Sequence, residues 1–227
     1  MGISPGLGTS PGSGTSRLQS FSDGVIAVAI TLLVLGIAVP KPVSHGDHRL
    51  AYQLGQLWPE FASYVTSFLT IGIIWINHHA MINRLRDADH TVLILNLLLL
   101  MSIGILPFAT ELMAAYLRQP HGQSVAAAIY SGSFLLMSIM FSALNRHILL
   151  GRHQMLTEQL SPQRRRQIYV RALAGLIPYV LATGLAAVSP YATLAICAAV
   201  ALFYAHPAAS GGQRPGVAQS QAPEPGE

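Results

Sequence analysis

Long stretches without a charged residue divide this sequence, and they limit what it can fold into more than any other feature. Four stretches hold 17, 23, 21 and 27 uncharged residues between flanking charges. They lie between Asp23 and Lys41, Glu60 and Arg84, Asp89 and Glu111, and Arg118 and Arg146. About 20 mainly apolar residues in a helix cross a hydrocarbon core of about 30 Å. The pattern therefore predicts four membrane-spanning helices.

A fifth stretch, between Arg171 and Arg214, holds 42 uncharged residues and is too long for one span. Ser189-Pro190 divides it, and proline is favourable in the first turn of a helix. We therefore expect two helices here, near residues 168–188 and 190–206, which gives six spans. Charged residues make up 10% of the chain, against about 25% in soluble domains. The predicted fold class is an all-α membrane protein with six transmembrane helices.

The two ends of the chain differ from this transmembrane domain, which covers residues 17–206. Residues 1–16 and 207–227 are rich in Gly, Pro, Ser, Ala and Gln and contain no long apolar run. Such segments cannot bury enough apolar surface to offset the entropy of folding. We expect both to be disordered tails.

The basic residues predict the orientation of the chain. With the N-terminus inside, only Lys41, Arg49 and Arg118 fall outside. Ten fall inside: Arg17, Arg84, Arg86, Arg146, Arg152, Arg164, Arg165, Arg166, Arg171 and Arg214. This asymmetry follows the positive-inside rule and predicts that both termini are cytoplasmic. We expect the membrane to be the plasma membrane. The run Arg164–Arg166 has no interleaved aromatic residues, so we interpret it as an anchor near lipid headgroups and expect no nucleic-acid partner.

Four polar side chains lie inside the predicted spans, where such groups are costly and usually functional or paired. Asp23, His78 with His79, and Asn96 lie within about seven residues of the inner ends of the first three spans, or about 10 Å at 1.5 Å per residue. An acid, an imidazole and an amide at one depth can satisfy one another across three helices. We therefore expect a hydrogen-bonded clamp between these helices.

This cluster does not have the pattern of an enzyme site. Adjacent helical residues point about 100° apart, so His78 and His79 cannot both bind one metal ion. No H-E-x-x-H, G-x-S-x-G, Walker or dinucleotide-binding motif occurs in the spans. We expect no catalytic residue, no resident metal and no cofactor.

The first span begins with the motif Arg17-x-x-x-Phe21-Ser22-Asp23. This motif resembles the signature of the endolysosomal potassium channel family and its bacterial homologues, whose first helix begins R-x-x-x-F-S-D. Trp75-Ile-Asn-His78-His79 in the second span, and Asn96 followed by Leu106-Pro107-Phe108 in the third, add to a resemblance that covers residues 17–206. The family implies a homotetramer of six-helix subunits, in which the first helix lines a central pore for K⁺ ions.

The resemblance also implies roles within the first helix. In the family, the position seven residues after the signature Phe forms an apolar constriction, and the position ten after it is a Thr implicated in selectivity. Here these positions are Val28 and Thr31. Val28 is shorter than the Ile or Leu common at the constriction, so Val28, Leu32 and Leu35 all stay candidates for the narrowest point.

Helical periodicity separately places an apolar stripe on this helix. Phe21, Val28, Leu32 and Leu35 fall within about 60° of one another, with Thr31 on the flank. Val34 lies about 120° from Val28, toward the back of the helix. Asp23 lies about 140° from Val28, so a stripe that faces a pore turns Asp23 toward the second and third spans. The sequence has no T-V-G-Y-G filter, so potassium selection would rest on hydroxyl groups, pore width or dewetting of apolar rings.

Two other classes of membrane protein compete with the channel. A proton-coupled or other secondary transporter would use buried acid and imidazole groups as a proton relay. Carriers usually have internal repeats with broken helices at the midplane, and we find no such halves in this sequence. The other alternative is a non-conducting partner subunit. Single-channel currents from purified protein in liposomes would separate a channel from both.

Overall fold

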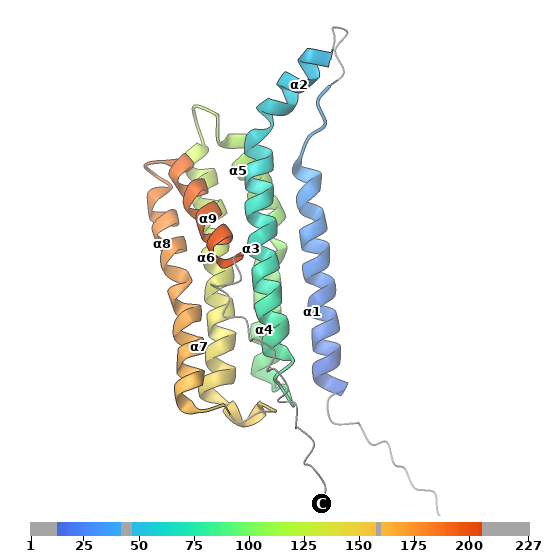
Figure 1. The fold of residues 1–227 in the computed structure, drawn as a ribbon, viewed down its shortest axis with the longest axis vertical. Coiled ribbons are helices and arrows are strands. Elements are labelled where there is room, and N and C mark those ends of the chain that lie inside the picture. The colour runs from blue at the N-terminus through green and yellow to red at the C-terminus, as the bar shows by residue number, and fades with distance from the viewer. Residues whose placement is uncertain (1–12, 42–46, 158–159, 206–227) are drawn as a thin grey trace, which may run out of the picture.

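The computed structural model describes residues 13–41, 47–157 and 160–205, which form a bundle of helices whose successive apolar spans run alternately up and down (Figure 1). The long helices are α1 Ser13–Leu32, α2 Asp47–Gln56, α3 Trp58–Ile82, α4 His90–Gly104, α5 Leu106–Tyr116, α6 Gln123–Arg146, α7 Pro162–Ala174, α8 Leu176–Leu185 and α9 Pro190–Ala205. Three short turns add to them: a 3-10 turn η1 (Leu33–Gly36) after α1, a π-helical turn η2 (His147–Gly151) after α6, and a 3-10 turn η3 (His153–Met155).

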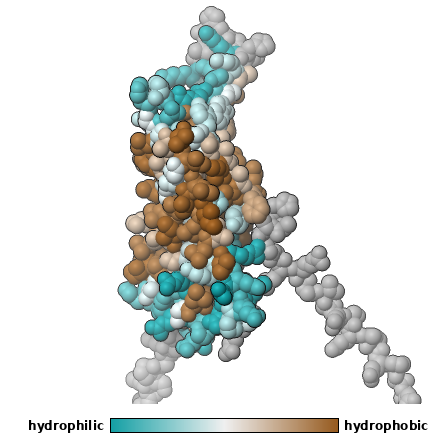
Figure 2. All heavy atoms as spheres, turned by 90° about the vertical axis from the view of Figure 1, so that its left-hand side faces the viewer, coloured by the Kyte–Doolittle hydropathy of each residue, from teal (hydrophilic) through white to brown (hydrophobic). Residues whose placement is uncertain are grey.

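Five helical segments are long and apolar enough to cross a membrane. They are Gly14–Gly36, Trp58–Ile82, His90–Tyr116, Gln123–Gly151 and Pro162–Leu185, and the sixth apolar segment, Pro190–Ala205, is shorter. Figure 2 shows the resulting apolar band, with hydrophilic side chains gathered at both ends of the molecule. The described helices confirm the predicted all-α architecture, with five or six apolar segments.

Two helices begin earlier than the sequence predicted. The fifth span begins at Pro162, where Ser161 Oγ accepts a hydrogen bond from the Arg164 N–H and proline occupies the first turn. The cap therefore places Arg164–Arg166 within the helix. The first helix begins at Ser13, inside the expected tail of residues 1–16. The rest of the two expected tails, residues 1–12 and 207–227, lies outside the described residues.

Prolines account for the breaks within the third and fifth spans. Proline has no N–H and its ring clashes with the carbonyl four residues earlier. Pro107 and Pro178 lie near the starts of α5 and α8, and α4 and α7 end three and four residues before them, at Gly104 and Ala174. Each span is therefore two helices in series.

Helix α2 is an element that hydropathy does not predict. It carries Arg49 and several polar side chains, and Figure 1 shows it projecting beyond the bundle. At its C-terminal end, Gln56 Oε1 accepts a hydrogen bond of 2.7 Å from Arg118 Nη1. This bond ties α2 to the loop that follows α5.

Helix α6 lies at the centre of the core and packs against α4, α5, α8 and α9. Its fully buried Tyr130 and Phe134 meet edge to face, with ring centroids 4.8 Å apart. Phe134 also packs against Tyr179 of α8, at 5.6 Å between centroids. These aromatic contacts fix α8 against α6, while α1 remains at the edge of the bundle beside α3 and α4 (Figure 1).

Candidate pore helix and its polar contacts

Helix α1 buries one narrow face against α3 and α4. The buried side chains are Leu18, Ser22, Ile26 and Ala29, followed by Leu33 at the start of η1, at intervals of three or four residues. This spacing is that of a single helical face. Gln19, Asp23, Val25 and Ile30 flank this face and are half-buried, and the opposite side of α1 faces away from the bundle.

The predicted apolar stripe lies on this outward surface. Phe21 is 53% exposed, Val28 57%, Leu32 44% and Leu35 75%. In a single subunit these side chains are open to whatever surrounds it. A closed pore along the stripe therefore requires further copies of the chain.

Thr31 is exposed beside the stripe, and its Oγ1 donates a hydrogen bond of 2.9 Å to the Val28 carbonyl. That bond uses the hydroxyl hydrogen and leaves oxygen lone pairs free to approach a cation. Val34, placed by periodicity on the back of the helix, is 49% exposed. Val34 belongs to the 3-10 turn η1 and not to α1 itself.

A buried chain of hydrogen bonds holds the inner face of α1 to α4 and α3. Ser22 Oγ donates to the Leu18 carbonyl at 2.9 Å and therefore accepts from Asn96 Nδ2, also at 2.9 Å. Asn96 Oδ1 in turn accepts from His78 Nε2 at 2.7 Å. Ser22, Asn96 and His78 are fully buried. The order of donors fixes the tautomer of His78 with hydrogen on Nε2, and its Nδ1 has no partner among the described residues.

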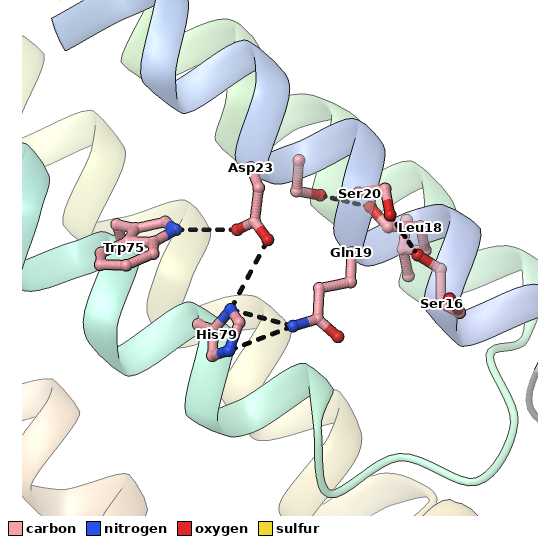
Figure 3. Close-up of polar contacts among 8 residues, drawn as sticks. Ser16, Leu18, Gln19, Ser20, Asp23, Trp75 and His79 are labelled. Carbon is pink, nitrogen blue, oxygen red and sulfur yellow. Dashed lines mark hydrogen bonds and ion pairs between the residues drawn. The ribbon is translucent and has the colours of Figure 1, made fainter.

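Asp23 belongs to a separate, partly exposed cluster between α1 and α3 (Figure 3). Trp75 Nε1 donates to Asp23 Oδ1 at 2.8 Å, and His79 Nδ1 lies 3.6 Å from Asp23 Oδ2. The Gln19 amide donates to the same ring, with Nε2 2.9 Å from His79 Nδ1. Figure 3 shows Asp23 and Gln19 reaching from α1 toward Trp75 and His79 on α3.

The sequence predicted that helices one, two and three meet at this level and named His79 among the neighbours of Asp23, but it did not separate this pair from His78 and Asn96. The expected bond from Asp23 to His78 or Asn96 is absent from the described contacts, and Ser22 takes that place. Adjacent helical residues point about 100° apart. Ser22 therefore faces α4 while Asp23 faces α3, and the clamp consists of two clusters. Arg17, the first residue of the motif, lies on the exposed side of α1.

Asp89 forms a contact between α4 and η2 that the sequence analysis missed. Its Oδ1 accepts from the Val92 N–H at 2.8 Å, which caps α4, and its Oδ2 lies 2.9 Å from His147 Nε2. Arg152 Nε lies 4.0 Å away. Burial acts to raise the pKa of Asp89, but the hydrogen bonds from Val92 and His147 and the nearby basic side chains outweigh it, so the pKa lies below its usual value. An Asp directly before an apolar run is a typical helix N-cap, so the capping role of Asp89 could be predicted from the sequence. No sequence pattern indicated that His147 would contact it.

A second buried polar cluster joins α3, α5 and α6 deeper in the bundle. Ser67 Oγ lies 2.7 Å from Thr110 Oγ1 and 3.3 Å from the Tyr130 hydroxyl. Hydroxyl groups bonded across helices stabilise packing within a membrane. No group of three or more His, Cys, Asp or Glu residues placed to hold a metal ion occurs within the described part of the chain.

The fold and this geometry define a class: a multi-pass helical membrane protein whose edge helix presents an apolar stripe and is held from behind by polar contacts. Comparison with known proteins gives the family. The family profile described as "Endosomal/lysosomal potassium channel TMEM175" matches residues 17–107. A potassium channel of Streptomyces collinus is 40% identical over 190 residues, covering 84% of this chain and 91% of that protein. The chain belongs to the TMEM175 family.

A solved structure supports the same assignment. The crystal structure of a lysosomal potassium-selective channel TMEM175 homolog from Chamaesiphon minutus superimposes with a TM-score of 0.73 at 36% identity, covering 84% of this chain and 96% of that one. The mouse endosomal/lysosomal proton channel TMEM175 is 36% identical over 152 residues, which is 64% of this chain but 30% of the mouse protein. These relatives are ion channels, and the chain is a member of a channel family and not an enzyme.

Proposed function

We propose that the chain is a potassium-permeable channel in which four copies surround an axis and α1 of each copy lines the pore. The stripe of Phe21, Val28, Leu32 and Leu35 would then form stacked apolar rings, and Thr31 a ring of hydroxyl oxygens. The relatives named potassium channels support the permeating ion. Apolar rings obstruct ions by dewetting, and hydroxyl oxygens can replace part of a cation's hydration shell.

The observation that carries this proposal is the division of α1 into two faces. Its inner face is held by Ser22, through Asn96 and His78, and by Asp23, through Trp75. These bonds fix the rotation of the helix about its own axis. The stripe on the outer face is thereby held in one direction. A pore wall requires such a fixed direction, whereas a surface that only faces lipid does not.

The orientation proposed for the assembly places both termini in the cytoplasm and the protein in the plasma membrane. The described helices support it, because nine arginines gather at the end of the bundle where α1 begins. They are Arg17, Arg84, Arg86, Arg146, Arg152, Arg164, Arg165, Arg166 and Arg171. Lys41, Arg49 and Arg118 belong to the other end, and positively charged loops stay in the cytoplasm.

Reconstitution of the purified protein in liposomes tests this function. We expect potassium flux, unitary currents in a planar bilayer, and an assembly mass four times the 24.3 kDa of the chain. Leu35→Asn or Val28→Asn should raise the flux, on the order of tenfold, because a polar side chain keeps water in an apolar constriction.

Val180→Asn provides the matched control for these variants. Val180 is 53% exposed, close to the 57% of Val28, but it belongs to α8, a helix on the far side of the bundle from α1. Its substitution should leave the flux unchanged. Equal increases in flux from Val180→Asn and Val28→Asn would contradict a pore along α1. Transport without unitary currents would contradict a pore as well and would favour a carrier.

A further inference from the structure

A cavity of about 260 Å³ lies among α3, α6, α7, α8 and α9, away from the candidate pore stripe. Helices α7 and α8 lie on the far side of the bundle from α1 (Figure 1), and Figure 2 views this side of the molecule. The cavity therefore faces the periphery of the proposed channel. Its lining comes from the same chain.

The cavity lies beside the end of the described part of the last helix. Helix α9 has 16 residues, or about 24 Å at 1.5 Å per residue, against a hydrocarbon core of about 30 Å. In Figure 1 it descends from the upper end of the bundle and stops beside α3 and α6 before reaching the arginine-rich end. Helix α7, which lies at that end, has no fully buried residue. Among the described residues, a space remains between α7 and the core.

The lining divides into an apolar part and a basic part. Met137 and Phe141 of α6, Ile168 of α7 and Val200 of α9 contribute apolar surface. Arg84, at the end of α3, and Arg164 and Arg171 of α7 also line the cavity. No Asp or Glu side chain is among the described residues that line it.

The position of the arginines on α7 follows from helical spacing. Arg164, Ile168 and Arg171 are four and three residues apart, so they share one face of the helix. Arg166 is about 200° from Arg164 and lies on the opposite face, outside the cavity. One face of α7 therefore presents two guanidinium groups and an apolar side chain to the same space.

We infer that this cavity binds an anionic phospholipid, with an acyl chain against the apolar part and the phosphate near Arg84 and Arg164. Guanidinium groups bind phosphate through short charge-assisted hydrogen bonds. Basic pockets between membrane helices bind anionic lipid headgroups. A free phosphate would leave the apolar lining without a partner, and a neutral lipid would not use the arginines. The lipid would complete the packing of α7 where α9 ends.

Lipid binding by the delipidated full-length protein, measured by native mass spectrometry in a neutral detergent, tests this inference. The probes are phosphatidylglycerol, phosphatidylcholine with the same acyl chains, and glycerol 3-phosphate. We expect phosphatidylglycerol to bind at least about tenfold more tightly than either of the others, because only it offers both an acyl chain and a net negative charge. Equal binding of the two lipids, or binding of glycerol 3-phosphate at the same affinity, would overturn the proposal.

Arg164→Gln and Arg166→Gln form a matched pair, because they remove the same charge from opposite faces of one helix. Arg164→Gln should weaken phosphatidylglycerol binding by about tenfold, the loss of one charge-assisted hydrogen bond. Arg166→Gln should leave the affinity unchanged. Equal weakening by both variants would show diffuse attraction to a basic surface and no built site. The lipid affinities of both variants are measured without ion flux. The lipid-site proposal can therefore be contradicted while the channel assignment stands, and the reverse.

A photocrosslinking amino acid at Phe141 identifies the occupant in the full-length chain. Benzoylphenylalanine is an aromatic replacement for this half-buried side chain, and Ile73, which also lines the cavity, provides a second position. In liposomes that contain phosphatidylglycerol, both positions should form adducts with the lipid. Adducts with residues 206–227 or with a second copy of the chain would name a different occupant and overturn the proposal.

Discussion

Asn96 connects three helices through one side chain, since it donates to Ser22 of α1 and accepts from His78 of α3 while belonging to α4. Asn96→Leu nearly keeps the volume but leaves the buried His78 Nε2–H without an acceptor. We expect the protein to lose about 1–3 kcal/mol of stability, the usual cost of an unpaired buried group. Thermal unfolding in detergent and the fraction of intact assembly measure this loss.

Asp23→Ala provides the comparison, and its effect should be smaller. The Asp23 side chain is 33% exposed and its partner His79 40%, so water can replace part of what is lost. Asn77→Leu is the control, because Asn77 is exposed and bonds to the Ile73 carbonyl of its own helix. If Asp23→Ala destabilised the assembly more than Asn96→Leu, the Asp23 cluster would be the principal clamp.

Thr31 allows a test of selectivity with little change in shape. Thr31→Val removes the hydroxyl oxygen and nearly keeps the side-chain volume. We expect the ratio of potassium to sodium permeability, measured from reversal potentials, to fall about fivefold, as for a loss of about 1 kcal/mol. Thr183→Val in α8 removes a hydroxyl that bonds to its own helix in the same way and should leave the ratio unchanged. An unchanged ratio in Thr31→Val would remove Thr31 from the selectivity mechanism.

The junction of α4 with η2 depends on the charge of Asp89. The pKa of Asp89 is lowered in the folded protein, so its carboxylate stabilises the fold. This stabilisation is fully present above the ordinary Asp pKa of about 4 and is lost as the pH falls through the folded pKa. Asp89→Asn keeps a capping side chain and removes the charge. The variant should be less stable than the wild type at pH 7, and the difference in unfolding temperature should shrink as the pH is lowered toward 3. A difference that is constant over this range would exclude the charge as its source.

Helical segments are the elements that could be predicted best from the sequence, because charged residues and prolines mark their ends directly. Pro190 does begin α9, and the intervals free of charge correspond to α1, α3, the α4–α5 pair and α6. Helix α2 could not be found in this way, since its residues are not predominantly apolar. The start of the fifth span was placed too late because arginines were assigned to a loop, whereas Ser161 and Pro162 begin the helix before them.

Contacts between helices could be predicted only in part. Residue counts give the depth of a side chain in a span, which is why Asp23, His78, His79 and Asn96 were expected at one level. The rotation of each helix decides which neighbour a side chain meets, and this depends on the packing of the whole bundle. A rotation of one residue, about 100°, exchanges Ser22 for Asp23 as the partner of Asn96. The cavity beside α7 was beyond sequence analysis for the same reason.

At the scale of the whole molecule, the short α9 makes the number of membrane crossings the decisive question for topology. Six crossings return the chain to the side from which it started, and five would leave the C-terminus outside. The basic residues favour six, because Arg214 then joins the arginines at the inner end. The prediction is that both termini are cytoplasmic and that the loop before α2 is external.

The single cysteine of the chain makes this prediction simple to test. Cys197 is fully buried, so Cys197→Ser gives a background without reactive thiols. In that background, Ser44→Cys should react with a membrane-impermeant maleimide on intact cells, because it lies between α1 and α2 in the sequence. Ser4→Cys and Ser220→Cys should react only after the cells are permeabilised. If Ser220→Cys reacted on intact cells while Ser4→Cys was protected, α9 would enter the membrane without a return to the cytoplasm, and the six-span topology would be wrong.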